Sequence, residues 1–166
     1  MSIKIKDLQS LLIHEIKDLY SAETQITDAL PQMIEAAHDP QLRKAFEHHL
    51  DETREHVSRL ESICDLLDCK PNGQKCAGME GLLEEGEDMV DEDAPDEVKD
   101  AGLIGAAQRV EHYEMAGYGT ARAFAKRLSL NEVAEILGQT LDEEKAADEK
   151  LTEIALSHVN TAAVDG

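Results

Sequence analysis

The sequence predicts an all-α protein, a bundle of four long helices in which one connection is much longer than the others. Three observations support this fold class. Apolar residues recur at steps of three and four over long stretches, which is the period of a helix with one buried face. Aromatic residues make up only 3% of the chain, so the core must be built mainly from aliphatic side chains. An acidic stretch in the middle separates two pairs of helical segments.

The first helix pair is predicted from its apolar stripes and from the turns that follow them. The first helix covers about residues 5–37, and the sequence His-Asp-Pro at 38–40 makes a turn after it. The second helix covers about residues 41–67, and the sequence Lys-Pro-Asn-Gly at 70–73 ends it. Pro31 lies inside the first stripe, where proline favours a kink or a break.

The second helix pair is predicted in the same way. The third helix covers about residues 95–128, because a proline followed by acidic residues is a typical helix start. The fourth helix covers about residues 131–158, and a short disordered tail is expected after it. A chain of this length suffices for one core, so residues 1–166 are predicted to form a single domain.

The connection between the second and third helices, residues 69–95, is the long one. It contains the sequence MEGLLEEGEDMV, which predicts a short helix of its own. Two helix hairpins joined by one long crossover form the ferritin-like variant of the four-helix bundle. Residues 80–100 hold eleven acidic residues and one basic residue, so this crossover is expected to be well solvated.

Charge and cysteine content limit the partners and the compartment. The formal net charge of −20 disfavours nucleic acid and anionic membranes, which attract clustered lysine and arginine. No apolar run approaches the length of a bilayer span, and the N-terminus has no signal-like core. The three cysteines, Cys64, Cys69 and Cys76, fit a reducing compartment, with a Cys69–Cys76 bridge as the alternative. We therefore expect a cytoplasmic protein.

Acidic residues interrupt the apolar stripes at positions that should face the core. Each predicted long helix contributes at least one of them: Glu23, Glu52, Glu111, Glu114 and Glu143. His56 follows Glu52 by one helical turn and shares its face. Burying an ionised carboxylate costs several kcal/mol unless it is paired. The predicted inner faces offer no lysine or arginine for this purpose.

An internal repeat connects these acidic residues. The sequence LDETREHVSRLESI at 50–63 aligns with LDEEKAADEKLTEI at 141–154, an offset of 91 residues that relates Glu52 to Glu143. The same offset relates Glu23 to Glu114. Each predicted hairpin therefore places one glutamate on its first helix and another on its second helix, 29 residues later.

Two divalent metal ions would balance four buried carboxylates. In di-iron and di-manganese bundles, two helices each supply a glutamate and the other two each supply a Glu-x-x-His motif. Oxygen ligands with some imidazole suit iron or manganese. The sequence thus predicts a site for two iron or manganese ions with the ligands Glu23, Glu52, His56, Glu111, Glu114 and Glu143.

Structural roles for the same residues remain open as alternatives. The glutamates can form a polar layer that fixes the register of the helices, and His56 can be a boundary histidine paired with Glu52. His49, one turn before Glu52, is predicted to be structural. Tyr118, one turn after Glu114, is predicted to be a packed aromatic residue whose hydroxyl is hydrogen-bonded.

Five long blocks of the sequence carry a resemblance to a known family: LYSAE (19–23), HLDET (49–53), CAGMEGLLEE (76–85), VEHYEMAGYGT (110–120) and TLDEEKAADEKLT (140–152). They resemble the YciE/YciF family of ferritin-like bacterial stress proteins. The resemblance implies a ferritin-like homodimer with a link to stress responses and kinship to dimetal carboxylate proteins such as rubrerythrins.

Two classes of function are compatible with this resemblance. One is a dimetal oxidoreductase or metal-handling protein that acts on a small oxidant such as peroxide or on ferrous ions. The other is a non-catalytic structural or binding dimer whose metal site is vestigial or empty.

The sequence departs from the ferritin-like ligand pattern. Glu52 is followed by His56 at the fourth position instead of the third, and the repeat-related Glu143 has Ala147 there. One imidazole ligand is therefore missing, and Glu111, Glu144 or Asp148 can replace it. We expect two unequal metal positions, with the position nearer His56 filled first.

Overall fold

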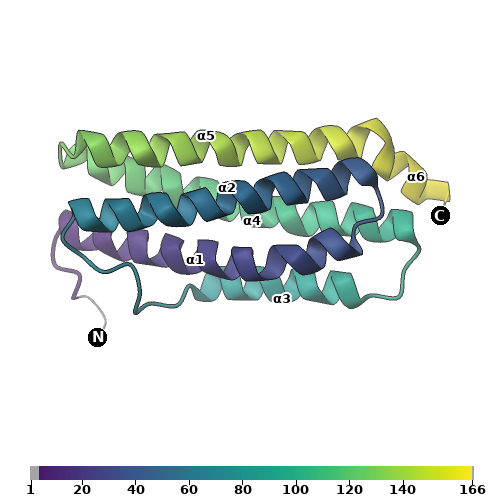
Figure 1. The fold of residues 1–166 in the computed structure, drawn as a ribbon, viewed down its shortest axis with the longest axis horizontal. Coiled ribbons are helices and arrows are strands. Elements are labelled where there is room, and N and C mark those ends of the chain that lie inside the picture. The colour runs from purple at the N-terminus through teal and green to yellow at the C-terminus, as the bar shows by residue number, and fades with distance from the viewer. Residues whose placement is uncertain (1–3, 166) are drawn as a thin grey trace.

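The protein is a bundle of four long antiparallel helices with a shorter helix packed along one side (Figure 1). This is a computed structural model, and it describes residues 4–165. The long helices are α1 (Leu8–Ala36), α2 (Pro40–Leu66), α4 (Asp96–Arg127) and α5 (Asn131–Ile154). The predicted all-α bundle is thereby confirmed. None of the helices in the described part combines the length and the apolar character that crossing a membrane requires.

The helix boundaries follow local sequence chemistry. Asp7 and Ser10 form a reciprocal cap, in which the backbone N–H of each residue donates to the side chain of the other, at the start of α1. The side chain of Asp39 caps the start of α2 by accepting hydrogen bonds from the backbone N–H groups of Gln41 and Leu42, and Pro40 occupies the first position of the helix. The helix α1 continues through Pro31, so the proline does not end it.

The long crossover contains the predicted extra helix, α3 (Ala77–Asp91), which packs against α1 and α4. Cys76 anchors its start, because its Sγ atom lies 3.0 Å from an oxygen of Asp18 and 3.0 Å from the hydroxyl of Tyr113. The Tyr113 hydroxyl also donates to Asp18 at 2.9 Å. The three cysteines are free thiols, so the alternative of a bridge between Cys69 and Cys76 is wrong.

The end of the chain differs from the prediction of a disordered tail. A π-helical turn, Ala155–Val159, continues α5 and leads into α6 (Asn160–Asp165). Val159 is buried in the core, and a ring nitrogen of His158 lies 2.6 Å from a carboxylate oxygen of Asp39. These contacts hold the segment against the turn between α1 and α2, which the sequence pattern alone did not indicate.

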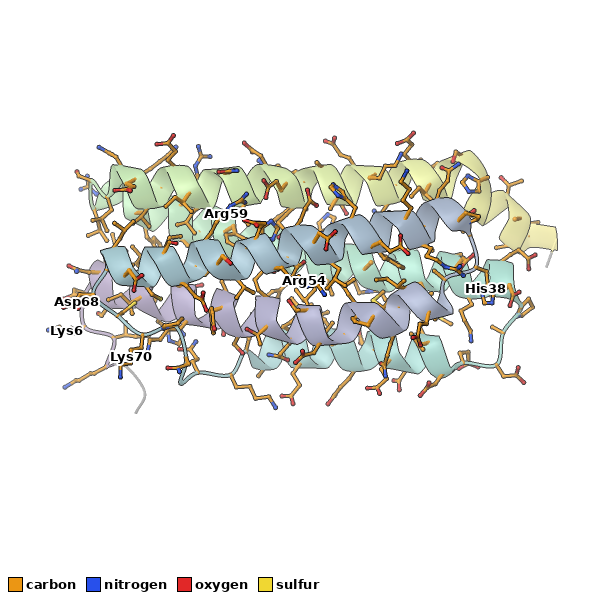
Figure 2. All side chains as sticks on the ribbon, viewed as in Figure 1. Lys6, His38, Arg54, Arg59, Asp68 and Lys70 are labelled. Carbon is orange, nitrogen blue, oxygen red and sulfur yellow. The ribbon has the colours of Figure 1, made fainter. Side chains whose placement is uncertain are left out.

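The core consists of two apolar clusters. One contains Leu12, Ile16, Leu60 and Leu137 and lies toward the start of α1 and the end of α2. The other contains residues such as Phe46 and lies toward the opposite end. Figure 2 orients the bundle, with Asp68 and Lys70 at the first end and His38 at the second. Polar side chains separate the two clusters, and they form the candidate site.

Candidate metal centre

A layer of buried polar side chains crosses the middle of the bundle. Its members come from all four long helices, and none exposes more than 6% of its surface. We call this set the polar layer: Glu23, His49, Thr53, His56, Glu111, Glu114, Thr140 and Glu144.

The register of α2 decides which of its polar residues face inward. Its buried side chains follow one another at regular steps of four and three: Leu42, Phe46, His49, Thr53, His56, Leu60 and Ile63. Thr53 therefore occupies the core position, and its hydroxyl donates to the backbone carbonyl of His49. Glu52, one residue earlier, is only half-buried at the edge of the layer.

The same shift of one residue occurs in α5. Glu144 is fully buried, whereas the side chain of Glu143 is 27% exposed. A helix turns by about 100° per residue, so a neighbouring pair cannot share one inward direction. The sequence predicted that Glu52 and Glu143 face the core. The structure instead places Thr53 and Glu144 in the polar layer, with Glu52 and Glu143 at its edge.

The internal repeat holds in three dimensions when it is read one residue later. With the offset of 91, Thr53 corresponds to Glu144 and His56 corresponds to Ala147. The helix α2 thus carries Thr53-x-x-His56, and α5 carries Glu144-x-x-Ala147. Each helix keeps one member of the Glu-x-x-His pair that dimetal bundles use and has lost the other.

One half of the layer is centred on His56. Its Nδ1 atom lies 3.2 Å from an oxygen of Glu23 and 3.0 Å from an oxygen of Glu144. These three side chains are arranged so that one donor atom from each lies within 4.8 Å of the others. The buried hydroxyl of Tyr118 donates to Glu23, which confirms the hydrogen bond expected for this tyrosine.

The other half of the layer is centred on His49. Its Nε2 atom lies 3.2 Å from an oxygen of Glu111 and 3.9 Å from an oxygen of Glu144. Together with Glu114, these residues form a second group whose donor atoms lie within 4.8 Å of one another. Glu144 belongs to both groups, so it can bridge two cations.

The two glutamates outside the layer contact the imidazoles from the solvent side. Glu143 accepts two hydrogen bonds from the guanidinium of Arg59, at 2.5 and 3.0 Å, and lies 2.8 Å from Nε2 of His56. Arg59 stands on α2, beside α5, as Figure 2 shows. Glu52 lies 3.8 Å from Nδ1 of His49. A carboxylate in this position orients a histidine and fixes which ring nitrogen faces the site.

The suggested substitute Asp148 does not enter the layer. One of its oxygens accepts a hydrogen bond from Gln108 at 3.2 Å and lies 3.4 Å from a ring nitrogen of His112 near the surface. Of the substitutes proposed from the sequence, Glu111 and Glu144 therefore have the required position.

Burial and mutual repulsion raise the pKa of three carboxyl groups. Burial is the largest cause for Glu111 and Glu114, and the charge of Glu144 adds to it, so both pKa values lie well above the ordinary range. Burial also raises the pKa of Glu23, although His56 opposes this effect. Burial therefore disfavours the charged form of all three carboxyl groups.

The other three titratable members of the layer have pKa values shifted toward their charged forms. Burial disfavours the charge of His56, but contacts with Glu144 and Glu23 raise its pKa to about 11. Burial also disfavours the charge of His49, but the carboxylates of Glu52 and Glu144 outweigh it and raise the pKa of this imidazole. The imidazoles of His56 and His49 outweigh burial at Glu144 and lower its pKa. Protons can therefore balance the layer without a metal, and a metal must displace them.

The donor atoms of the layer fit a pair of divalent cations. Nine buried oxygen and nitrogen atoms in these side chains make no hydrogen bond of regular geometry within the described part of the chain, although some imidazole nitrogens lie at ion-pair distance from carboxylates. They belong to Glu23, His49, His56, Glu111, Glu114 and Glu144. Buried polar atoms are normally paired, and unpaired ones call for an explanation such as an ion. The donor set is rich in carboxylate and contains two imidazoles, which suits iron or manganese.

The sequence analysis found four of the six residues that form these two groups, namely Glu23, His56, Glu111 and Glu114. It assigned His49 a structural role and named Glu144 only as a substitute. The regular four-and-three ladder of α2, which includes both His49 and His56, is the signal that indicates the correct register. Whether these residues bind metal stays a prediction.

Comparison with known proteins supports the shared fold and sequence. Residues 7–164 match the family described as "Domain of unknown function (DUF892)". The protein YciF of Escherichia coli K12 is 41% identical over 162 residues, which span 97% of this chain and 98% of that protein.

Two solved structures resemble the protein closely. The crystal structure of the Escherichia coli stress protein YciF superposes with a TM-score of 0.90 at 41% identity, covering 94% of this chain and 99% of that one. A protein from Rhodopseudomonas palustris, titled a putative structural protein, has a TM-score of 0.87 at 41% identity and covers 92% and 97% of the two chains. This chain belongs to the family of domains of unknown function that is designated DUF892, and it is a homologue of the stress protein YciF.

Proposed function

We propose that the protein binds two divalent metal ions, iron or manganese, in its polar layer and acts in a stress response as an oxidoreductase or metal-handling protein. The observation that carries this proposal is the convergence of nine unpaired donor atoms from four helices. A metal pair in such a site would supply redox chemistry toward a small oxidant such as peroxide. Alternatively, the site itself would take up ferrous ions as cargo.

The side chains of the layer have distinct roles in this proposal. Glu144 lies between His56 and His49 and can be shared by both cations. Glu143 holds the Nε2 side of His56, which leaves the Nδ1 atom directed at Glu23 and Glu144. Tyr118 donates to one oxygen of Glu23 and leaves the other oxygen without a partner. The layer is therefore organised to present its lone pairs at defined positions.

We propose that the protein is a cytoplasmic homodimer. The three free thiols fit a reducing compartment. The net charge of −20 argues against nucleic acid or an anionic membrane as a partner. Assembly as a homodimer is the expectation from the resemblance to ferritin-like stress proteins, and sedimentation of the purified protein tests it.

A second candidate function is a non-catalytic structural or binding role with an empty site. The pKa shifts favour it, because protons on Glu111, Glu114 and the imidazoles can balance the layer. The solved relative from Rhodopseudomonas palustris is titled a putative structural protein. The two candidates differ in one measurable property, which is the uptake of metal.

Metal analysis with a matched pair of variants tests the proposal. Untagged protein is loaded with Mn²⁺ or, without oxygen, with Fe²⁺, and the bound metal is counted. We expect two metals per chain in the wild type and in Glu55→Gln, a control at an exposed position of α2. The isosteric change Glu114→Gln should weaken binding by at least about tenfold, because it removes a buried anionic ligand. Absence of metal from the loaded wild type would favour the structural role.

A further inference from the structure

A cavity of about 550 Å³ opens beside the half of the polar layer that contains His49. Its lining comes from the helices α1 to α5. Most of its wall is apolar and includes Ile26, Leu30, Met33, Phe46, Val110 and Leu151. His49 and Glu111 of the polar layer also line it, together with the half-buried Glu52, so the cavity reaches the layer. The volume lies within the range of small-molecule sites, roughly 300–1,000 Å³.

Small side chains create this space at specific positions. Ala45 on α2, Ala107 on α4, and Ala146 and Ala147 on α5 line the cavity. Ala147 is the residue that the repeat relates to His56, so the missing imidazole leaves part of the opening. The cavity is thus connected with the departure from the ferritin-like pattern.

Two lysines stand at the exposed part of the cavity, where the carboxylate of Glu52 is already paired with His48 at 3.3 Å. Lys44 on α2 and Lys150 on α5 are exposed and line it, and these two helices pack side by side (Figure 1). The opening therefore lies along the seam between α2 and α5. Lys44 has no ion-pair partner in the described residues, and Lys150 contacts only Glu153 of its own helix, at 2.9 Å. Two ammonium groups above an apolar chamber suit an anionic head with an apolar tail.

We propose that this cavity binds a medium-chain aliphatic carboxylic acid. Its carboxylate contacts Lys44 and Lys150 at the rim, and its chain fills the apolar chamber toward His49 and Glu111. This binding site goes beyond the proposed metal function. His49 and Glu111 of the polar layer form its inner end, whereas the lysines at the rim and the apolar side chains that would hold the ligand are not members of the layer. If metal is bound, the far end of the chain lies next to it.

Calorimetric titration with decanoate tests the proposal, with decanol as the neutral ligand of the same chain length. We expect decanoate to bind at one site per chain and more tightly than decanol. Each of Lys44→Gln and Lys150→Gln should weaken decanoate by about two- to fivefold, as for the loss of one exposed ionic contact. Lys145→Gln, a control on the same helix but outside the lining, should have no effect.

Filling the chamber gives an independent test. Ala147→Leu and Ala45→Leu should each weaken decanoate by about tenfold or more, since a branched side chain then occupies the space of the ligand. Ala116→Leu, at an exposed position of α4, is the matched control. Thermal melts establish that every variant is folded.

Three results would overturn the proposal. The first is no binding of decanoate at millimolar concentration, and the second is equal affinity for decanol. The third is a cavity-filling variant that leaves decanoate affinity unchanged but disrupts a dimer in sedimentation, since a second copy would then cover the opening. All titrations are run with and without chelator. Decanoate binding that persists without metal separates this site from the metal proposal.

Discussion

The two halves of the polar layer differ although repeat-related helices build them. Around His56, the guanidinium of Arg59 and the carboxylate of Glu143 close the seam between α2 and α5. Around His49, the same seam opens into the 550 Å³ cavity. The comparison shows that each repeat departs once from the Glu-x-x-His pattern, with Thr53 in the first and Ala147 in the second, and that the small Ala147 lines the half that is open.

The largest expected effect comes from Glu144, which both halves share. Glu144→Ala leaves the buried imidazolium of His56 without one of its carboxylate partners. Breaking a buried ion pair in this way lowers the free energy of unfolding by about 3–5 kcal/mol. Glu143→Ala should cost about 1 kcal/mol, because this carboxylate is partly exposed. Urea unfolding of the chelated proteins measures both values. Equal losses would mean that the shared position has no special role.

Removal of metal tests whether cations hold the two halves together. A ligand that binds only the folded state stabilises it by about 2.7 kcal/mol at a hundredfold excess over Kd. Chelation should therefore lower the melting temperature by about 5–10 °C for a chain of this size. The Glu114→Gln variant serves as the control and should respond much less. An unchanged wild-type melt would indicate that the layer is structural.

Histidine substitutions probe each half separately. His56→Ala should weaken the tighter Mn²⁺ position by about 1–3 kcal/mol, because a buried polar partner is lost. Ala147→His restores the missing imidazole in the open half and should strengthen the weaker position. Calorimetric titration resolves the two positions. Equal wild-type affinities, or tight binding without His56, would contradict the inequality of the halves.

Metal uptake should depend on pH, because metal replaces protons in the layer. Glu111 and Glu114 have a pKa raised mainly by burial, and the pKa of His49 is raised by Glu52 and Glu144 against burial. A raised pKa means that protons compete with metal for these groups at a higher pH, so metal affinity should fall as pH falls. For each proton that metal binding releases, the metal affinity should change about tenfold per pH unit. Titration in two buffers of different ionisation enthalpy counts the protons, and a count of zero would refute the exchange.

The smallest expected effect concerns the closure of the seam at Arg59. Arg59→Met removes the two hydrogen bonds to Glu143 but keeps the aliphatic part of the side chain. The pair is partly exposed, so the free energy of unfolding should fall by only about 0.5–1 kcal/mol. Arg54→Met, at an exposed position of the same helix, is the control. A change above that range would show that the closed half depends on this arginine.

Much of the fold was predictable because it depends on local periodicity. The stripes of α1 and α4 placed Glu23, Glu111 and Glu114 correctly, since apolar residues flank each of them at helical steps. In α2 the neighbours of the site are Leu50 and Val57 on one side and Phe46 and Leu60 on the other. An apolar stripe that includes Leu50 and Val57 turns Glu52 inward, but this register is wrong because Leu50 and Val57 are only half-buried at the flank of the helix.

The sequence by itself determined the four long helices, the long crossover and the repeat that relates Glu23 to Glu114. Only the tertiary structure decided which of two adjacent acidic residues turns inward, and it chose Glu144 over Glu143. The inward face of a helix spans 100° or more, which is about the rotation between neighbouring residues. Local periodicity therefore leaves adjacent candidates nearly equivalent. Packing against three other helices removes this ambiguity, and it also leaves the cavity where Ala147 replaces an imidazole.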